Sequence, residues 1–191
     1  MQEGRIACLG DSNTYGYNPY NFFGDPYDTP WPLALEMQLG EPVINLGENG
    51  VEIPHRERDF YWLRRNLTQY LPIRCMTIML GSNDLLNLRG RDVPRIAGRM
   101  EALVAYLKEL LPDTKLLLLA PPELCGMEAF LNPACLELTE MYRQLAEREG
   151  LLFADPKDWE LKMAGDGVHL EESAHLVFAE RLMAFMQEFI K

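Results

Sequence analysis

The sequence predicts a three-layer α/β/α sandwich built on a five-stranded parallel sheet. Short apolar runs alternate with longer amphipathic stretches, which is the pattern of parallel strands joined by helices. The apolar runs are hydrophobic at nearly every position, as expected of strands that are covered on both faces. Because the crossovers between parallel strands are right-handed, five such units favour the flavodoxin-like strand order 2-1-3-4-5.

Each element can be assigned in chain order. The expected strands are residues 5–9, 42–46, 75–80, 115–120 and 151–154. The expected helices are residues 32–39, 59–70, 93–111, 133–149 and 171–190. The third helix has a clear helical periodicity, with apolar side chains at three- and four-residue steps: Ile96, Met100, Leu103, Leu107 and Leu110. Gly150 is well placed to end the fourth helix.

Length and composition bound the class of protein. A chain of 191 residues with 48% apolar content fits one domain, residues 1–191, with a full core. The formal charge of -11 argues against a nucleic-acid partner, because phosphate binding needs a basic surface. No apolar run approaches the ~20 residues that span a bilayer, and the first residues carry no targeting signal. We therefore expect no membrane partner and a cytoplasmic location.

The four cysteines do not form the pattern of a disulfide framework. Cys8 and Cys75 fall within expected strands, whereas Cys125 and Cys135 share a loop and helix start and could lie near each other. No CxxC pair is present, so a zinc site has no starting point. We expect four reduced thiols and no metal.

A candidate nucleophile follows the first strand. In parallel α/β sheets, ligands gather at the carboxyl ends of the strands. Strand one ends in Gly10-Asp11-Ser12, so the Ser12 hydroxyl is expected on a tight turn that faces this edge. The alternative is that Ser12 only caps a helix, as serine often does.

Candidate oxyanion donors follow strands two and three. The segment from Asn45 to Gly50 contains two glycines, which let a substrate oxygen approach a bare N–H. After strand three, the Asn83 amide could donate to an oxyanion, and Asp84 could fix the orientation of that amide. Taken alone, the glycines also fit ordinary turns and Asn83 also fits an Asx turn.

A candidate base lies before the last helix. Asp166 and His169 are three residues apart across a glycine-containing turn, so the carboxylate can meet one imidazole nitrogen while the other faces a serine. The other two histidines are weaker candidates. His55 lies in a polar loop and is expected to be solvated, and His175 lies on the last helix, where packing or a surface role is favoured.

These motifs together resemble the SGNH (GDSL-type) esterase and lipase family. Its four letters correspond to Ser12, Gly50, Asn83 and His169, and Gly50 is preferred to Gly47 because it lies five residues beyond Asn45. The resemblance implies an SGNH hydrolase fold and a hydrolase in which Ser12 attacks an ester. It also implies that the Ser12 N–H, the Gly50 N–H and the Asn83 amide hold the oxyanion. It implies neither a metal nor an organic cofactor.

The sequence departs from the family motif at one letter. Asn13 stands where leucine is usual, and the stretch from Gly10 to Tyr17 is similar to the arylesterase and lysophospholipase-like subgroup. Members of that subgroup often assemble into oligomers that wall in the active site, so the resemblance raises the expectation of a homo-oligomer.

An aromatic loop follows the nucleophile and is expected to wall the substrate pocket. The candidate substrate-binding side chains are Asn13, Tyr15, Tyr17, Phe22 and Phe23. A second candidate wall is the irregular segment 121–132. The aromatic rings could instead pack the loop onto the domain or onto a partner subunit.

The function expected from the sequence is hydrolysis of small carboxylic esters, with short acyl or aryl groups, through an acyl-Ser12 intermediate. The same residues would also serve a carbohydrate acetylesterase, a thioesterase or an acyltransferase. The non-enzyme alternative is a flavodoxin-like binding module whose serine and histidine are incidental.

Overall fold

The computed structural model confirms the predicted architecture. It describes residues 4–190, with the backbone alone for 187–190. One sheet has the strand order β2-β1-β3-β4-β5, and every neighbouring pair is parallel. The strands are β1 (Arg5–Gly10), β2 (Val43–Gly47), β3 (Ile73–Met79), β4 (Lys115–Leu119) and β5 (Leu152–Ala154).

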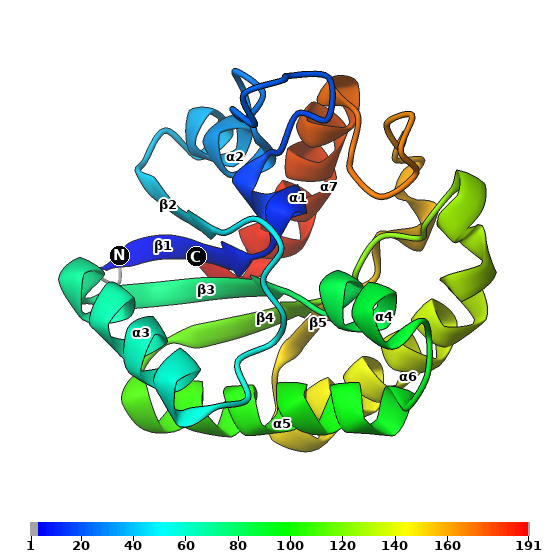
Figure 1. Cartoon of the computed structure of the whole chain (residues 1–191). Helices are drawn as coiled ribbons and strands as arrows, with labels where there is room; N and C mark the ends of the chain where they lie inside the picture. The colour runs from blue at the N-terminus through cyan, green and yellow to red at the C-terminus, as the bar shows by residue number, and fades with distance from the viewer. Residues whose placement is uncertain (1–3, 191) are drawn as a thin grey trace.

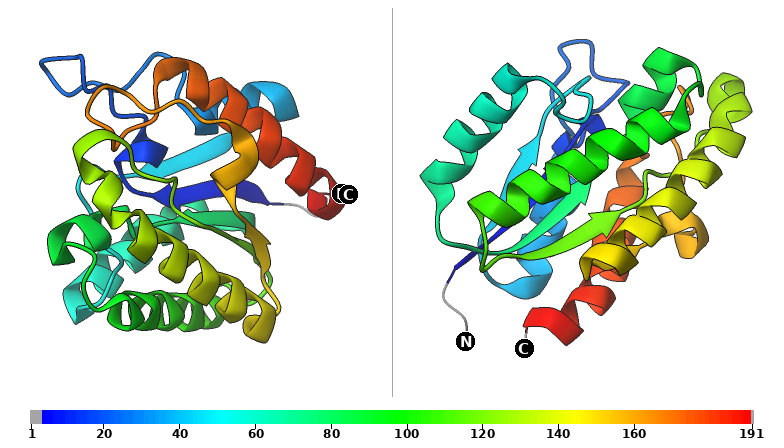
Figure 2. Two further views of the ribbon diagram at one scale, coloured as in Figure 1. Left: turned by 90° about the vertical axis from the view of Figure 1, so that its right-hand side faces the viewer. Right: turned by 90° about the horizontal axis from the view of Figure 1, so that it is seen from below.

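Helices cover both faces of this sheet, which makes three layers (Figures 1 and 2). On one face lie α2 (Trp31–Leu39) and α7 (Glu172–Ile190). On the other face lie α3 (Glu57–Leu67), α5 (Val93–Leu110) and α6 (Asn132–Glu149). The short helices are α1 (Ser12–Tyr15) and α4 (Ser82–Leu88), and the 3-10 turns are η1 (Thr68–Tyr70), η2 (Gly126–Leu131) and η3 (Pro156–Trp159).

Two separate cores result from alternation along the buried strands. In β1, Ile6 and Cys8 pack toward α2 and α7, whereas Ala7 and Leu9 pack toward the opposite layer. Their burial explains why the strand is apolar at successive positions. Strand β2 departs from this expectation, because its side chains are mostly half-buried rather than covered on both faces. It is an edge strand, and a hollow lies against part of it.

The sequence missed two helices that bear on the site. Helix α1 has only four residues and α4 only seven, so neither is long enough to show a helical periodicity. The expected helix 59–70 is instead α3 followed by the tighter turn η1, and β3 begins two residues earlier than expected.

The structure also shows the state of the cysteines and the length and apolarity of the helices. All four cysteines are free; Cys125 is exposed, whereas the other three are buried. Burial raises the pKa of the Cys8 thiol to about 12, so this group behaves as a small apolar side chain. Over residues 4–190, no helix combines the length and apolarity needed to cross a bilayer.

Candidate active site

The candidate nucleophile lies where β1 passes into α1. Asp11 is the N-cap residue of α1, and its Oδ1 accepts a hydrogen bond from the Asn13 N–H (3.0 Å). Ser12 is the first residue of the helix and is 7% exposed. The first N–H groups of a helix have no partner within it, so the Ser12 N–H can donate to a group outside the turn.

Ser12, His169 and Asp166 form one chain of hydrogen bonds. The Ser12 Oγ lies 2.9 Å from His169 Nε2, although the two residues are 157 positions apart. His169 Nδ1 lies 2.7 Å from Asp166 Oδ2. Because an ionised carboxylate only accepts, Nδ1 carries the hydrogen and Nε2 is free to accept the serine proton.

The same carboxylate also shapes its own turn. Its Oδ1 accepts hydrogen bonds from the Val168 and His169 N–H groups (3.0 and 3.1 Å). Burial acts to raise the pKa of Asp166, but the His169 hydrogen bond and these two backbone donors outweigh it, so the pKa lies below its ordinary value. Asp166 therefore remains ionised at neutral pH.

A glycine is required in this turn. Gly167 has φ +73°, and a Cβ there would lie 2.3 Å from the Cys125 carbonyl oxygen. The close approach brings the Gly167 carbonyl to the Cys125 N–H, which donates to it at 2.8 Å. The segment after β4 thus supports the turn that carries His169.

Asn13 joins the nucleophile turn to the histidine loop. The sequence predicts substrate contact for this residue, but the structure buries it to 2% exposure and gives both of its amide atoms backbone partners. Its Oδ1 accepts from the Leu170 N–H (2.8 Å), and its Nδ2 donates to the Val168 carbonyl (3.1 Å). The two bonds lie on either side of His169, so Asn13 fixes the backbone that carries the histidine.

A second carboxyl group is buried beneath the site. Asp11 is 1% exposed, and burial raises its pKa to about 6 against the opposing effects of the Asn13 N–H and of His169. Its Oδ2 has no hydrogen-bond partner among residues 4–190. Near neutral pH, a charge buried in this way destabilises the fold.

The two other candidate oxyanion donors, Gly50 and Asn83, belong to the segments that follow β2 and β3. Gly50 is exposed with φ +72°, and it belongs to the segment 48–56 between β2 and α3, which we call the strap. The Asn83 amide donates one hydrogen to the Val51 carbonyl in the strap (2.9 Å). A primary amide has two hydrogens, so one remains for an oxyanion.

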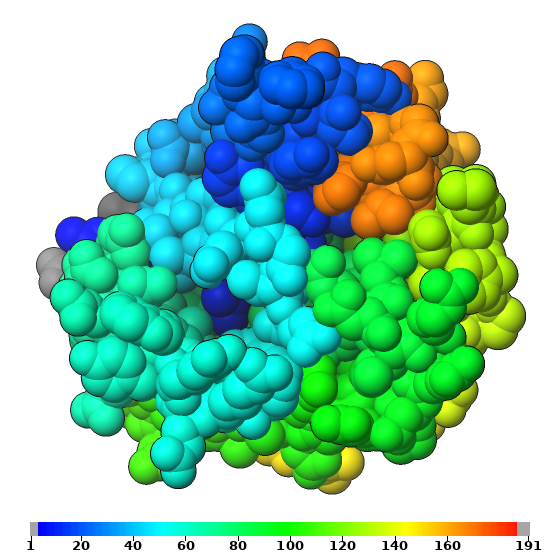
Figure 3. Space-filling model, viewed as in Figure 1, coloured from blue at the N-terminus to red at the C-terminus, as the bar shows by residue number. Residues whose placement is uncertain are grey.

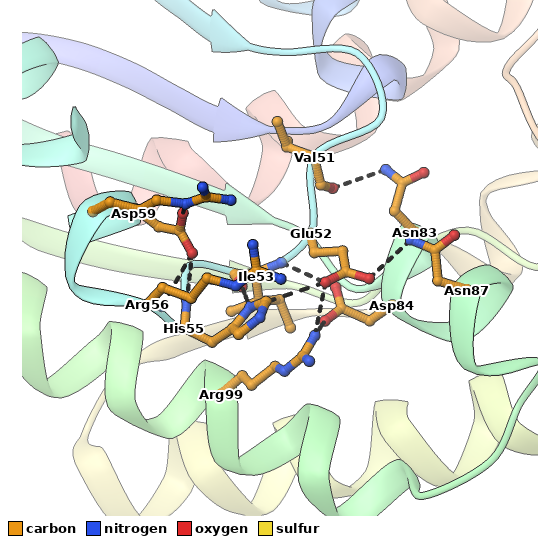
Figure 4. A network of polar contacts seen from close by, with 11 residues as sticks. Val51, Glu52, Ile53, His55, Arg56, Asp59, Asn83, Asp84, Asn87 and Arg99 are labelled. Carbon is orange, nitrogen blue, oxygen red and sulfur yellow. Dashed lines mark hydrogen bonds and ion pairs between the residues drawn. The ribbon is translucent and has the colours of Figure 1, made fainter. Parts of the chain in front are cut away.

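A polar network fixes the strap, and it corrects one expectation (Figure 4). Asp84 does not bond the Asn83 amide; its buried carboxylate accepts from the Ile53 N–H (3.0 Å) and pairs with Arg99. Arg99 also reaches Glu52 at 3.1 Å. Asp84 therefore holds the backbone of the strap rather than the amide.

The remaining histidines lie outside the hydrogen-bond chain. His55, expected to be solvated, is instead partly buried in the strap and donates its Nδ1 hydrogen to the Ile53 carbonyl (2.9 Å). His175 packs inside the domain, as one of the two sequence alternatives expected, and accepts from the Trp31 N–H (3.2 Å). Burial lowers the pKa of His175 to about 4, so it is neutral at neutral pH.

The aromatic loop touches the site through some of its members. The Tyr17 ring lies 4.6 Å from the His169 ring, and the Tyr20 hydroxyl accepts from the Gly165 N–H (2.8 Å). Phe22 and Phe23 contact each other and are 96% and 84% exposed. Tyr15 is half-buried in α1.

Fold and site together define an ester hydrolase. The chain matches the model of the GDSL-like lipase/acylhydrolase family over residues 8–177, so it belongs to that family. It is similar to the native aryl esterase of M. smegmatis (26% identity, TM-score 0.79, covering 97% of this chain and 99% of that one). It is also similar to Est24, a carbohydrate acetylesterase from Sinorhizobium meliloti (25% identity, TM-score 0.77, covering 96% and 100%).

Another comparison shows the fold alone. A carbohydrate acetylesterase family member from Sinorhizobium meliloti aligns at 23% identity with a TM-score of 0.82, covering 97% of this chain and 98% of that one. No curated protein sequence gives a match. The family and fold predicted from the sequence are confirmed by these comparisons.

Replacing Asn13 should slow catalysis while the domain stays folded. Asn13→Ala removes both bonds to the histidine loop, and a misplacement of about 1 Å costs roughly 100-fold in rate. We expect kcat/KM for p-nitrophenyl acetate to fall by about that factor, measured beside thermal unfolding.

Thr114 offers a control at the opposite edge of the sheet, because its hydroxyl donates to the Ile73 carbonyl at the start of β3. Thr114→Val should lose about 1–3 kcal/mol of stability, with little loss of rate. Equal rates for the two variants would show that Asn13 has no special part in positioning His169.

Replacing Asp11 should make stability less dependent on pH. Its pKa in the fold, about 6, lies above the ordinary 3.8, so ionisation destabilises the fold as the pH rises through this interval. Asp11→Asn keeps the acceptor for the Asn13 N–H without the charge. Its free energy of unfolding should exceed that of the wild type by about 1–3 kcal/mol above pH ~6 and match it below pH ~4. The free energies are measured by chemical denaturation, and Asp113→Asn, a change at an exposed carboxylate, is the control. If the difference in free energy of unfolding between Asp11→Asn and the wild type stayed constant from pH ~4 to ~6, the raised pKa of Asp11 would be contradicted.

Proposed function

We propose that the protein hydrolyses small carboxylic esters, with short acyl or aryl groups, through an acyl-enzyme intermediate on Ser12. The observation that carries this proposal is the chain of hydrogen bonds from Ser12 Oγ through His169 to Asp166. A hydroxyl, a base with a free nitrogen and an ionised carboxylate behind that base are the parts that nucleophilic acyl transfer needs.

In the first half-reaction, His169 Nε2 takes the Ser12 proton while the Oγ attacks the ester carbonyl. Asp166 stabilises the imidazolium that forms and keeps the ring in place. The tetrahedral intermediate collapses as His169 returns the proton to the leaving alcohol. Water then attacks the acyl group by the reverse path and releases the acid.

The oxyanion of this intermediate would be held by three donors: the Ser12 N–H, the Gly50 N–H and the free hydrogen of the Asn83 amide. A donor of this kind is worth roughly 3 kcal/mol of activation free energy. The network through Asp84 and Arg99 supports the proposal, because it holds in advance the strap on which Gly50 lies.

The choice of ester follows from what borders the serine. The Tyr17 ring beside His169 offers an aromatic surface to a small acyl or aryl group. A carbohydrate acetylesterase is the second candidate, favoured by the similarity to Est24 of Sinorhizobium meliloti. Either substrate uses the same serine chemistry, and a panel of acetylated sugars and aryl esters separates them.

Replacing Ser12 tests the proposal directly. Ser12→Ala should lower hydrolysis of p-nitrophenyl acetate by at least about 1,000-fold, because it removes the nucleophile but little volume. A fluorophosphonate probe should form an adduct on Ser12 of the wild type, located by digestion and mass spectrometry. A variant with near-normal turnover, or an adduct on another residue, would remove the basis of the assignment.

Tyr17 should influence the choice of acyl group more than the exposed tip of its loop does. We expect Tyr17→Leu to change the ranking of p-nitrophenyl acetate, butyrate and octanoate by kcat/KM. Phe22→Ala and Phe23→Ala are the aromatic controls, because both side chains are almost fully exposed to solvent in the single chain. If the tip variants change the ranking instead, the tip folds over the substrate.

A further inference from the structure

A large hollow lies beside the strap, on the side away from the triad residues. It has a volume of about 800 Å³ and is bounded by the carboxyl end of β2, the strap and α3. Pockets that bind small molecules typically measure ~300–1,000 Å³. Figure 3 shows it between the two cyan walls, with atoms of the first strand at its floor.

The hollow is distinct from the site described above. None of the residues that line it among 4–190 is Ser12, Asn83, Asp166 or His169. Val51 belongs to both places, since it lines the hollow while its carbonyl accepts from the Asn83 amide. The strap is therefore the wall between the two sites.

The floor of the hollow is apolar. It includes Leu9, Leu46, Ile53, Leu63 and Leu80. Helix α3 is held away from β2 at this point, which explains why β2 is less buried than the sequence pattern predicts. A floor of this kind favours a ligand with at least one face of C–H groups.

The rim, in contrast, carries polar side chains and aromatic rings. Glu48 and Asn66 are exposed there, whereas the amide of the exposed Asn45 already bonds the Thr14 carbonyl and the Gly47 N–H. His55 uses Nδ1 on the Ile53 carbonyl, which leaves its Nε2 free to accept. Trp62, on the α3 wall, is 55% exposed.

The charges around the hollow disfavour an anionic ligand. Among the residues that the structure describes, Glu48, Glu52 and Asp59 line it together with one arginine, Arg56, and no lysine. Arg99 pairs with Glu52 and Arg58 lies 3.5 Å from Asp59, so part of the acidic charge is compensated. What remains is a set of acceptors and the Asn66 amide, which together suit hydroxyl groups.

We propose that this hollow is a binding site for an uncharged saccharide. A sugar ring has C–H faces that pack on an indole ring or on leucines, and hydroxyls that bond carboxylates, amides and an imidazole. An acyl chain would match the leucine floor but would leave the polar rim without partners. The proposal does not depend on which ester reacts at Ser12, because Ser12 does not line the hollow.

The first experiment measures binding to the Ser12→Ala protein, which cannot turn over a substrate. The probes are methyl glucoside, N-acetylglucosamine, xylobiose and cellobiose, followed by calorimetry and by saturation-transfer NMR. Trp31 and Trp159 are 0% and 6% exposed, so iodide quenching of fluorescence reports mainly on Trp62. We expect at least one saccharide to bind and to protect Trp62 from iodide.

Variants then locate the site. Trp62→Ala and Asn66→Ala should each weaken binding by at least about tenfold, and both are exposed positions where the fold should tolerate the change. Arg64→Ala is the control, because Arg64 is exposed on the same helix but does not line the hollow. It should bind saccharide as the wild type does.

A last arm distinguishes a sugar that is part of the substrate from a separate ligand. In the protein that retains Ser12, Trp62→Ala should raise KM for the acetylated form of the bound sugar if the sugar belongs to the substrate, and should leave KM for p-nitrophenyl acetate unchanged. If Trp62→Ala leaves KM unchanged for both esters, the sugar binds as a separate ligand. Absence of saturable binding below ~10 mM for all four probes, or binding that survives Trp62→Ala and Asn66→Ala, would overturn the proposal.

Discussion

The geometry of the site depends on the two hydrogen bonds of the Asn13 amide. The carboxyl ends of parallel strands bring Ser12 and His169 to the same edge of the sheet, but an edge is many ångströms long. A distance of 2.9 Å between Oγ and Nε2 needs a direct tie between the two loops. Asn13 supplies it, because it follows Ser12 and holds the backbone on both sides of His169. The Asp166 turn then only has to orient the ring.

Much of this arrangement could be predicted from the sequence because it depends on local patterns. Apolar runs and helical periodicity determine the layers and the strand order. The motifs around Ser12 and between Asp166 and His169 are compact, so residues a few positions apart define their chemistry. Their meeting follows from the topology, which places the loops after β1 and β5 at one edge.

The parts that escaped prediction depend on partners far apart in the chain. Asn13 bonds a loop 155 or more positions away, and no local pattern distinguishes this from contact with substrate. Asp84 was expected to serve its neighbour Asn83, but the nearest donors in space are Ile53 and Arg99. Arg99 lies beside the apolar residues of α5, and the sequence alone does not show that it pairs with Asp84 and Glu52. The half-buried state of β2 could not be foreseen either, since leucines beside a hollow look the same in sequence as leucines in a core.

The strap explains why a buried ion pair is placed in this part of the domain. A buried carboxylate and guanidinium are costly to desolvate, and hydrophobic residues would often stabilise a core as well. Here the pair has a geometric task, since Asp84 and Arg99 hold a segment without secondary structure that has solvent on one side and a hollow on the other. Ile53 packs in the core and Val51 packs against it, but Glu48, Asn49 and Gly50 are exposed, so packing holds only part of the segment. The directional bonds to the Ile53 N–H and to Glu52 fix its backbone further.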